Sequence, residues 1–164
     1  MRRIRFVVVF LLLLALFEVP LLIDSVDRAA VRPFTTGIAH FSGSIIRIVR
    51  PEVRVSETII SGSCFAVDIH NGCNGLEASL FLLAAVLAFP ASGRMRAMGA
   101  IAGFAIVQFA NLVRIVSLYL IGCYHRTWFE AFHLAVWQTI IFAIAVGFFL
   151  LWTRRATASD ALST

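Results

Sequence analysis

The sequence predicts an all-α polytopic membrane protein with about four transmembrane helices and a small extracytoplasmic cap. Three observations predict this class. Hydrophobic residues make up 60% of the 164 residues, whereas about half of the residues of an ordinary soluble domain are apolar. They gather in four long runs, and arginines stand beside the ends of these runs. The net charge is +5, and the basic residues, all arginines, stand beside the apolar runs. This placement indicates a lipid bilayer, and not a nucleic acid, as the partner.

The four runs predict a single integral membrane domain over residues 1–164, with spans at about 6–23, 76–91, 97–122 and 134–152. The first run follows a basic MRRIR start, as the core of a signal peptide would, but no small-residue cleavage site follows it. We therefore expect an uncleaved span. The second run is shorter than the roughly 20 helical residues that cross a bilayer core. We expect its helix to begin within the polar segment that precedes it.

The arginines also predict the orientation. The segments before the first span, between the second and third spans and after the fourth contain seven arginines and one acidic residue, Asp160. The other two connections, residues 24–75 and 123–132, mix arginines with Asp and Glu. Since positively charged segments remain in the cytoplasm, both termini are expected there. Residues 24–75 are then an extracytoplasmic segment.

The long segment 24–75 contains two structural patterns. Apolar residues recur at helical spacing over residues 38–50, which predicts a helix that lies along the membrane interface. Further on, Val53 and Val55 alternate with polar residues, and the same alternation returns after Ser61-Gly62-Ser63. This pattern predicts a small β-hairpin. Together the two elements are expected to cap the outer mouth of the bundle.

Three polar residues, Gln108, Asn111 and Arg114, interrupt the third span. Their spacing by three keeps them on one broad helix face. A charged side chain within a span costs about 2.5–3.5 kcal/mol at the helix centre. Arg114 lies ~26 Å along the helix from Ala97. A side chain that extends from this depth to the outer interface would explain Arg114 without a functional role. The polar stripe as a whole favours a lined cavity or a bound partner.

Residues 70–77 read HNGCNGLE and place Cys73 in a polar, glycine-rich segment at the start of the second span. Asn74 and Glu77 have the spacing of a capping box at a helix N-terminus. A thiol at this place is near the positive end of the helix dipole, which favours the reactive thiolate. Gly75 allows a substrate backbone to approach closely. The segment therefore predicts a cysteine nucleophile.

The predicted topology brings two further groups to the membrane face that carries Cys73. Arg114 lies near the outer end of the third span, and His133 lies at the outer start of the fourth. An imidazole can accept the proton of the thiol, and a guanidinium can stabilise the oxyanion of a tetrahedral intermediate. His70 stands three residues before Cys73 and competes with His133 for the role of base.

These motifs resemble the exosortase/archaeosortase family. The resemblance rests on Cys73 followed by Asn-Gly at the head of one span, on NLVR within the next, and on His133 at the head of the last. With four spans in 164 residues, the chain looks most like the compact exosortase H group. The resemblance implies that Cys73 is the nucleophile, Arg114 the transition-state stabiliser and His133 the acid/base. Asn111 fits the Asn-x-x-Arg element of the family.

The resemblance also implies the substrate, the partners and the location. The substrate is the C-terminus of an exported protein, with a short motif, a transmembrane stretch and a basic tail. Cleavage passes through a thioester acyl-enzyme, whose product is transferred to an unknown acceptor nucleophile. The reaction needs no cofactor or metal. It takes place on the extracytoplasmic face of the bacterial inner membrane.

The cysteines offer alternatives to a free nucleophile. Cys64, Cys73 and Cys123 are all expected outside, where disulfides persist. A Cys64–Cys73 bridge would make the polar segment structural. We favour a Cys64–Cys123 bridge or no bridge, which leaves Cys73 free.

Two other kinds of function remain open from the sequence. The first is a metal-dependent membrane hydrolase, because four side chains have the chemistry of zinc ligands: His70, Cys73, His125 and His133. The second is a non-enzymatic scaffold or transporter subunit, in which the polar stripe binds partner helices.

Overall fold

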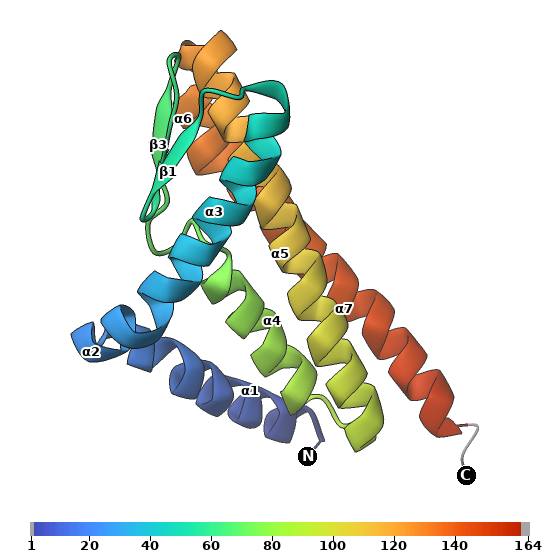
Figure 1. Cartoon of the computed structure of the whole chain (residues 1–164). Helices are drawn as coiled ribbons and strands as arrows, with labels where there is room; N and C mark the ends of the chain where they lie inside the picture. Colours follow the sequence, from blue (N-terminus) through green and yellow to red (C-terminus); the bar gives the residue numbers. More distant parts are fainter. Residues whose placement is uncertain (1, 162–164) are drawn as a thin grey trace.

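A computed structural model describes residues 2–161 of the chain, as a helical bundle with a small cap (Figure 1). The bundle consists of four helices: α1 (Arg2–Glu18), α4 (Leu76–Ala88), α5 (Gly93–Tyr124) and α7 (Trp137–Ala161). The cap consists of one helix and three strands: α3 (Arg32–Val49), β1 (Arg54–Ser56), β2 (Ile59–Ser61) and β3 (Ala66–Asp68).

Short helical segments connect these elements. Between α1 and α3 lie the 3₁₀-helix Val19–Leu22, α2 (Asp24–Val26) and a π-helical turn, Asp27–Val31. Between α5 and α7 lie the 3₁₀-helix Arg126–Trp128, α6 (Phe129–Ala131) and a second π-helical turn, Phe132–Val136.

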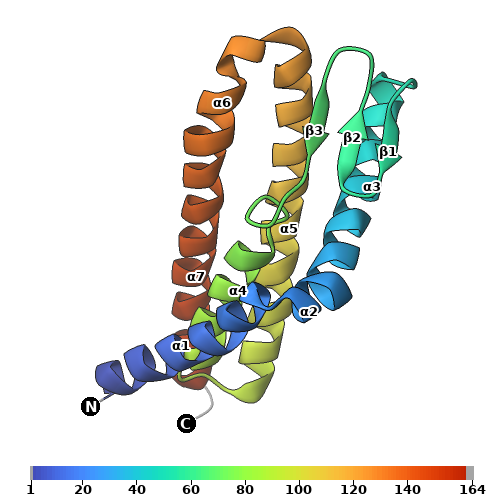
Figure 2. The ribbon, with the colours of Figure 1, turned by 90° about the vertical axis from the view of Figure 1, so that its left-hand side faces the viewer.

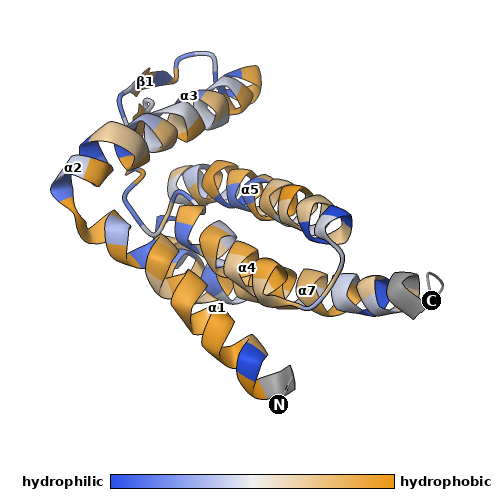
Figure 3. Ribbon diagram, turned by 90° about the horizontal axis from the view of Figure 1, so that it is seen from below, coloured by the Kyte–Doolittle hydropathy of each residue, from blue (hydrophilic) through white to orange (hydrophobic). Residues whose placement is uncertain are grey.

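The short helix α4 is at the centre of the bundle and packs against α1, α5 and α7. Helices α5 and α7 run side by side in opposite directions, with α3 and the sheet on the far side of α5 from α7 (Figure 2). The start of α1 and the end of α7 lie at the end of the bundle away from the sheet (Figure 1). Apolar residues cover most of these helices, as expected for helices that face lipid (Figure 3).

This architecture confirms the predicted all-α membrane class. Three stretches are long and apolar enough to cross a bilayer: Ile4–Leu22, Gly93–Tyr124 and Arg126–Ala158. Helix α4 has 13 residues, about 20 Å at the rise of an α-helix, which is shorter than a hydrocarbon core of about 30 Å. The four-span organisation therefore stays a prediction.

The cap confirms and extends the predicted hairpin. Strands β2 and β3 pair antiparallel around the loop that contains Gly62, and β1 adds a third strand, with Val55 opposite Ile60 and Ile60 opposite Val67. The helix predicted over residues 38–50 begins earlier, at Arg32.

The cap has its own hydrophobic core, which joins it to α5. Ile46 of α3, Ile60 of β2 and Tyr119 of α5 are buried together there. A Cys64–Cys123 disulfide links the β2–β3 loop to the end of α5. Of the three cysteines, Cys73 is the free one. The cap is thus fixed to α5 by packing and by a covalent bond.

Candidate active site

The structure brings Cys73, Arg114 and His133 together from three separate parts of the chain. Cys73 Sγ lies 3.2 Å from His133 Nε2. Arg114 Nη2 lies 3.7 Å from Cys73 Sγ and donates a hydrogen bond of 3.4 Å to the backbone carbonyl of His133. Arg114 is only 4% exposed. A thiol, an imidazole and a buried guanidinium therefore share one site.

The backbone on both sides of Cys73 is sharply turned. Gly72 has φ = +82° and Gly75 has φ = +75°, in the left-handed region that favours glycine. Cys73 N donates to the carbonyl of His70. At Gly75 a Cβ atom would lie 2.9 Å from the Cβ and Cγ atoms of Asn111. Gly75 therefore also allows the loop to lie directly on α5.

Asn74 connects this loop to the cap by hydrogen bonds. Its side chain is 1% exposed. The amide nitrogen donates to Thr35 Oγ1 on α3 at 2.9 Å, and the amide oxygen accepts from Leu76 N at 2.9 Å. Thr35 in turn donates to the carbonyl of Val31. Loop and cap are thus connected through one buried amide.

The predicted capping box is wrong. Within residues 2–161, Asn74 accepts from Leu76 N, two residues on, rather than from Glu77 N. The residue directly before α4 is Gly75, whose left-handed backbone turns the chain away from capping-box geometry. Glu77 instead lines a cavity beside the site. The helix still begins at Leu76, so its N-terminus follows Cys73 closely.

His133 belongs to the π-helical turn Phe132–Val136 that precedes α7. Such turns are rare and occur frequently at functional sites. The ring of His133 stacks on Phe129 with 5.6 Å between centroids and an angle of 26° between the planes. Phe129 and Thr35 were not among the predicted site residues, because neither residue belongs to a sequence motif.

The side chain of His70 pairs with Asp68. His70 Nε2 lies 3.3 Å from Asp68 Oδ2 on an exposed surface. His125 directly follows the last residue of α5. Within residues 2–161, no three His, Cys, Asp or Glu side chains are grouped closely enough to hold a metal ion. The four residues proposed as zinc ligands are therefore not assembled into a site.

The polar stripe of α5 faces the start of α4. Gln108 Nε2 donates to Ser79 Oγ, which donates to the carbonyl of Gly75. Asn111 is fully buried, and its carboxamide has no hydrogen-bond partner among the described residues. One turn further on, Arg114 lines a cavity. The stripe thus packs against the loop that contains Cys73.

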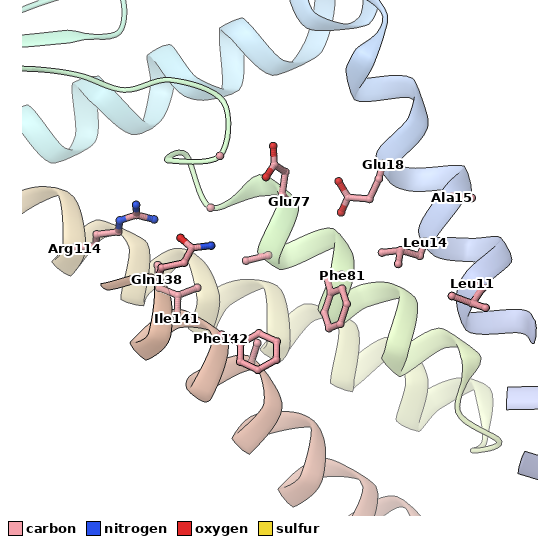
Figure 4. Close-up of a pocket in the computed structure, with 14 residues that line it drawn as sticks. Leu11, Leu14, Ala15, Glu18, Glu77, Phe81, Arg114, Gln138, Ile141 and Phe142 are labelled. Atoms are coloured by element: carbon pink, nitrogen blue, oxygen red, sulfur yellow. The ribbon is translucent and has the colours of Figure 1, made fainter. Parts of the chain in front are cut away.

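This cavity has a volume of about 630 Å³ and lies among α1, α4 and α7. Gly72 and Gly75, on either side of Cys73, belong to its lining. Glu18 and Glu77 lie near each other on one side of the cavity, across from Arg114 and Gln138 on the other side (Figure 4). A substrate in this cavity would lie beside Cys73.

Comparison with known proteins identifies the family of the chain. The family model of the transmembrane exosortases (Exosortase_EpsH) matches residues 1–153. No curated protein and no solved structure matches the chain significantly. The matched range includes Cys73, Arg114 and His133 and confirms the resemblance inferred from three short motifs. The chain is a membrane-embedded member of the transmembrane exosortase family, which acts in protein sorting.

Proposed function

We propose that this protein is a cysteine transpeptidase or peptidase that cleaves the C-terminal sorting signals of exported proteins. The observation that carries the proposal is the 3.2 Å approach of Cys73 Sγ to His133 Nε2, because a nucleophile and its base must be within hydrogen-bond reach. Family membership supports the same class of reaction. The extracytoplasmic location, the cytoplasmic termini and the four spans belong to this proposal.

In the first half of the reaction, the proton of the Cys73 thiol moves to Nε2 of His133. The thiolate attacks the carbonyl carbon of the substrate peptide bond and forms a tetrahedral oxyanion. His133 then returns the proton to the departing amine, and the C–N bond breaks. The product is a thioester between Cys73 and the exported protein, and the released amine carries the membrane segment of the signal.

Arg114 has the position required of an oxyanion stabiliser. Its Nη2 atom lies 3.7 Å from Cys73 Sγ, so a carbonyl bonded to the sulfur places its oxygen near the guanidinium. The hydrogen bond from Arg114 to the His133 carbonyl fixes the side chain before the substrate arrives. A fixed donor in a buried site acts more strongly than one in water.

In the second half, an acceptor nucleophile attacks the thioester carbonyl and His133 removes its proton. The C–S bond breaks, and the thiol of Cys73 is regenerated by the proton on His133. Water as the acceptor gives hydrolysis, and an amine or hydroxyl gives transfer. Orientation of the imidazole comes from its stacking on Phe129.

The test uses a co-expressed sorting-signal protein and measures its shortening. Cys73→Ala is expected to abolish cleavage. Loss of the base in His133→Ala is expected to lower the rate about 10²–10⁴-fold, and loss of the donor in Arg114→Ala about 10²–10³-fold. His40→Ala is the matched control, because His40 is an exposed histidine of α3, and it should retain the wild-type rate.

Two outcomes would contradict the proposal. Normal shortening of the substrate by Cys73→Ser would favour a scaffold instead of an enzyme. Full activity of His133→Ala together with inactivity of His70→Ala would assign the base to the other histidine. Each variant is first checked for wild-type amounts in the membrane, so that failure to insert is not read as loss of chemistry.

A further inference from the structure

A lateral groove runs along α4 between α1 and α7. It consists of the 630 Å³ cavity beside Cys73 and a second cavity of about 200 Å³, which share Phe81 and Ala145 in their linings. On α1 the lining extends from Glu18 to Phe6, about 18 Å for twelve residues at the rise of an α-helix. The groove is therefore long enough for about three turns of a helix.

The groove is polar at one end only. Glu18, Glu77 and Arg114 lie at the end next to Cys73, whereas the remaining walls are almost entirely apolar, with Phe81 and Phe142 prominent (Figure 4). An occupant that matches this lining is apolar along most of its length and becomes polar where it passes Cys73. None of the described residues of the spanning stretch of α1 is buried, which leaves this wall open toward the membrane.

We propose that this groove binds the transmembrane stretch of the substrate as a helix and thereby delivers the cleaved bond to Cys73. This inference rests on the proposed function and on its topology. The exported part of the substrate precedes its transmembrane stretch, so the N-terminal end of the bound helix lies at the outer, polar end of the groove. A tethered substrate presents its peptide at high effective concentration.

Glu18 and Glu77 complement that end of the substrate helix. The first turn of a helix has unpaired N–H groups and the positive end of the helix dipole, and carboxylates are stabilising there. Within residues 2–161, neither Glu18 nor Glu77 forms a salt bridge, so both are available to a ligand. The same two charges repel the phosphate group of a phospholipid, which makes a peptide helix the better occupant.

A photocrosslinking experiment identifies the occupant. In the Cys73→Ala protein, which keeps its substrate uncleaved, p-benzoylphenylalanine replaces either Leu11 or Leu12. These neighbours on α1 are 55% and 65% exposed, but only Leu11 lines the groove. With the co-expressed sorting-signal protein in the membrane, we expect at least tenfold more adduct with its transmembrane stretch from position 11. Equal yields, or adducts with lipid or a second copy alone, would overturn the inference.

Filling the groove tests the same inference through activity. Ala15 lines the groove and its exposed neighbour Leu16 does not. Ala15→Trp is expected to lower the cleavage rate more than tenfold, and Leu16→Trp less than twofold. Removal of both charges by Glu18→Gln and Glu77→Gln should weaken capture of the substrate. If Ala15→Trp and Leu16→Trp are equally active, the groove is not the binding site.

Failure of this inference and failure of the proposed function give different results. Cleavage that depends on Cys73 but is insensitive to Ala15→Trp would support the proposed enzymatic function and contradict substrate binding in the groove. Crosslinking from position 11 together with cleavage that does not need Cys73 would support substrate binding in the groove and contradict the role of Cys73 as nucleophile.

Discussion

Gly72 and Gly75 flank Cys73 with similar backbone conformations but in different surroundings. Their φ angles are +82° and +75°. A Cβ at Gly72 would have only the carboxylate oxygens of Glu77 nearby, at 3.7 and 3.9 Å. A Cβ at Gly75 would meet Asn111 at 2.9 Å. Gly72→Ala thus imposes backbone strain alone, whereas Gly75→Ala adds a steric conflict.

The two effects have different magnitudes. A left-handed conformation costs a residue with a Cβ about 1–2 kcal/mol, which applies to both variants. Overpacking against Asn111 adds about 1–3 kcal/mol for Gly75→Ala. Since ~1 kcal/mol shifts the Tm of a protein of this size by roughly 2–4 °C, Gly72→Ala should lower the Tm by about 2–8 °C. Gly75→Ala should lower it by about 4–20 °C.

Thermal unfolding of the detergent-purified protein, followed by tryptophan fluorescence, measures both values. Gly37→Ala is the control, because Gly37 lies within α3 and, apart from its chain neighbours and the backbone of its own helix, nothing lies within 4 Å of the place that its new methyl group would take. Alanine is favoured over glycine in a helix interior by roughly 1 kcal/mol, so the Tm should stay the same or rise. Equal Tm values for Gly72→Ala and Gly75→Ala would refute the packing of Gly75 on Asn111.

Three further predictions concern the site and the cap. Arg114→Lys keeps the positive charge but loses the planar guanidinium, and should lower substrate cleavage at least tenfold. Thr35→Val leaves the buried Asn74 amide without its acceptor and should lower the free energy of unfolding by about 1–3 kcal/mol, whereas Thr35→Ser should keep it within about 1 kcal/mol of wild type. Replacing Cys64 and Cys123 by Ser removes a bridge across a sequence separation of 59 and should lower stability by about 4 kcal/mol. Chemical denaturation in detergent measures the last two effects, and unchanged midpoints would contradict them.

The sequence alone was sufficient for the class of the fold and for the identity of the three candidate catalytic residues. Apolar runs of membrane-crossing length depend only on local composition, and three of the four predicted runs lie in the long apolar helical stretches that contain α1, α5 and α7. Alternation of apolar residues around Gly62 likewise encodes a hairpin locally. Cys73 and Arg114 were found because a thiol in a glycine-rich segment and a charge within a span are unusual wherever they occur.

Only the tertiary structure decided which of these groups meet. Both His70 and His133 were possible bases by sequence, and the nearer one in the chain turned out to face Asp68 instead. The capping box failed because Gly75, and not Asn74, is the residue directly before α4, and the Asn74 amide oxygen accepts from Leu76 N. The groove along α4 also could not be predicted from the sequence. Composition fixes which segments enter a membrane, but distances between side chains depend on how those segments pack, which no single segment encodes.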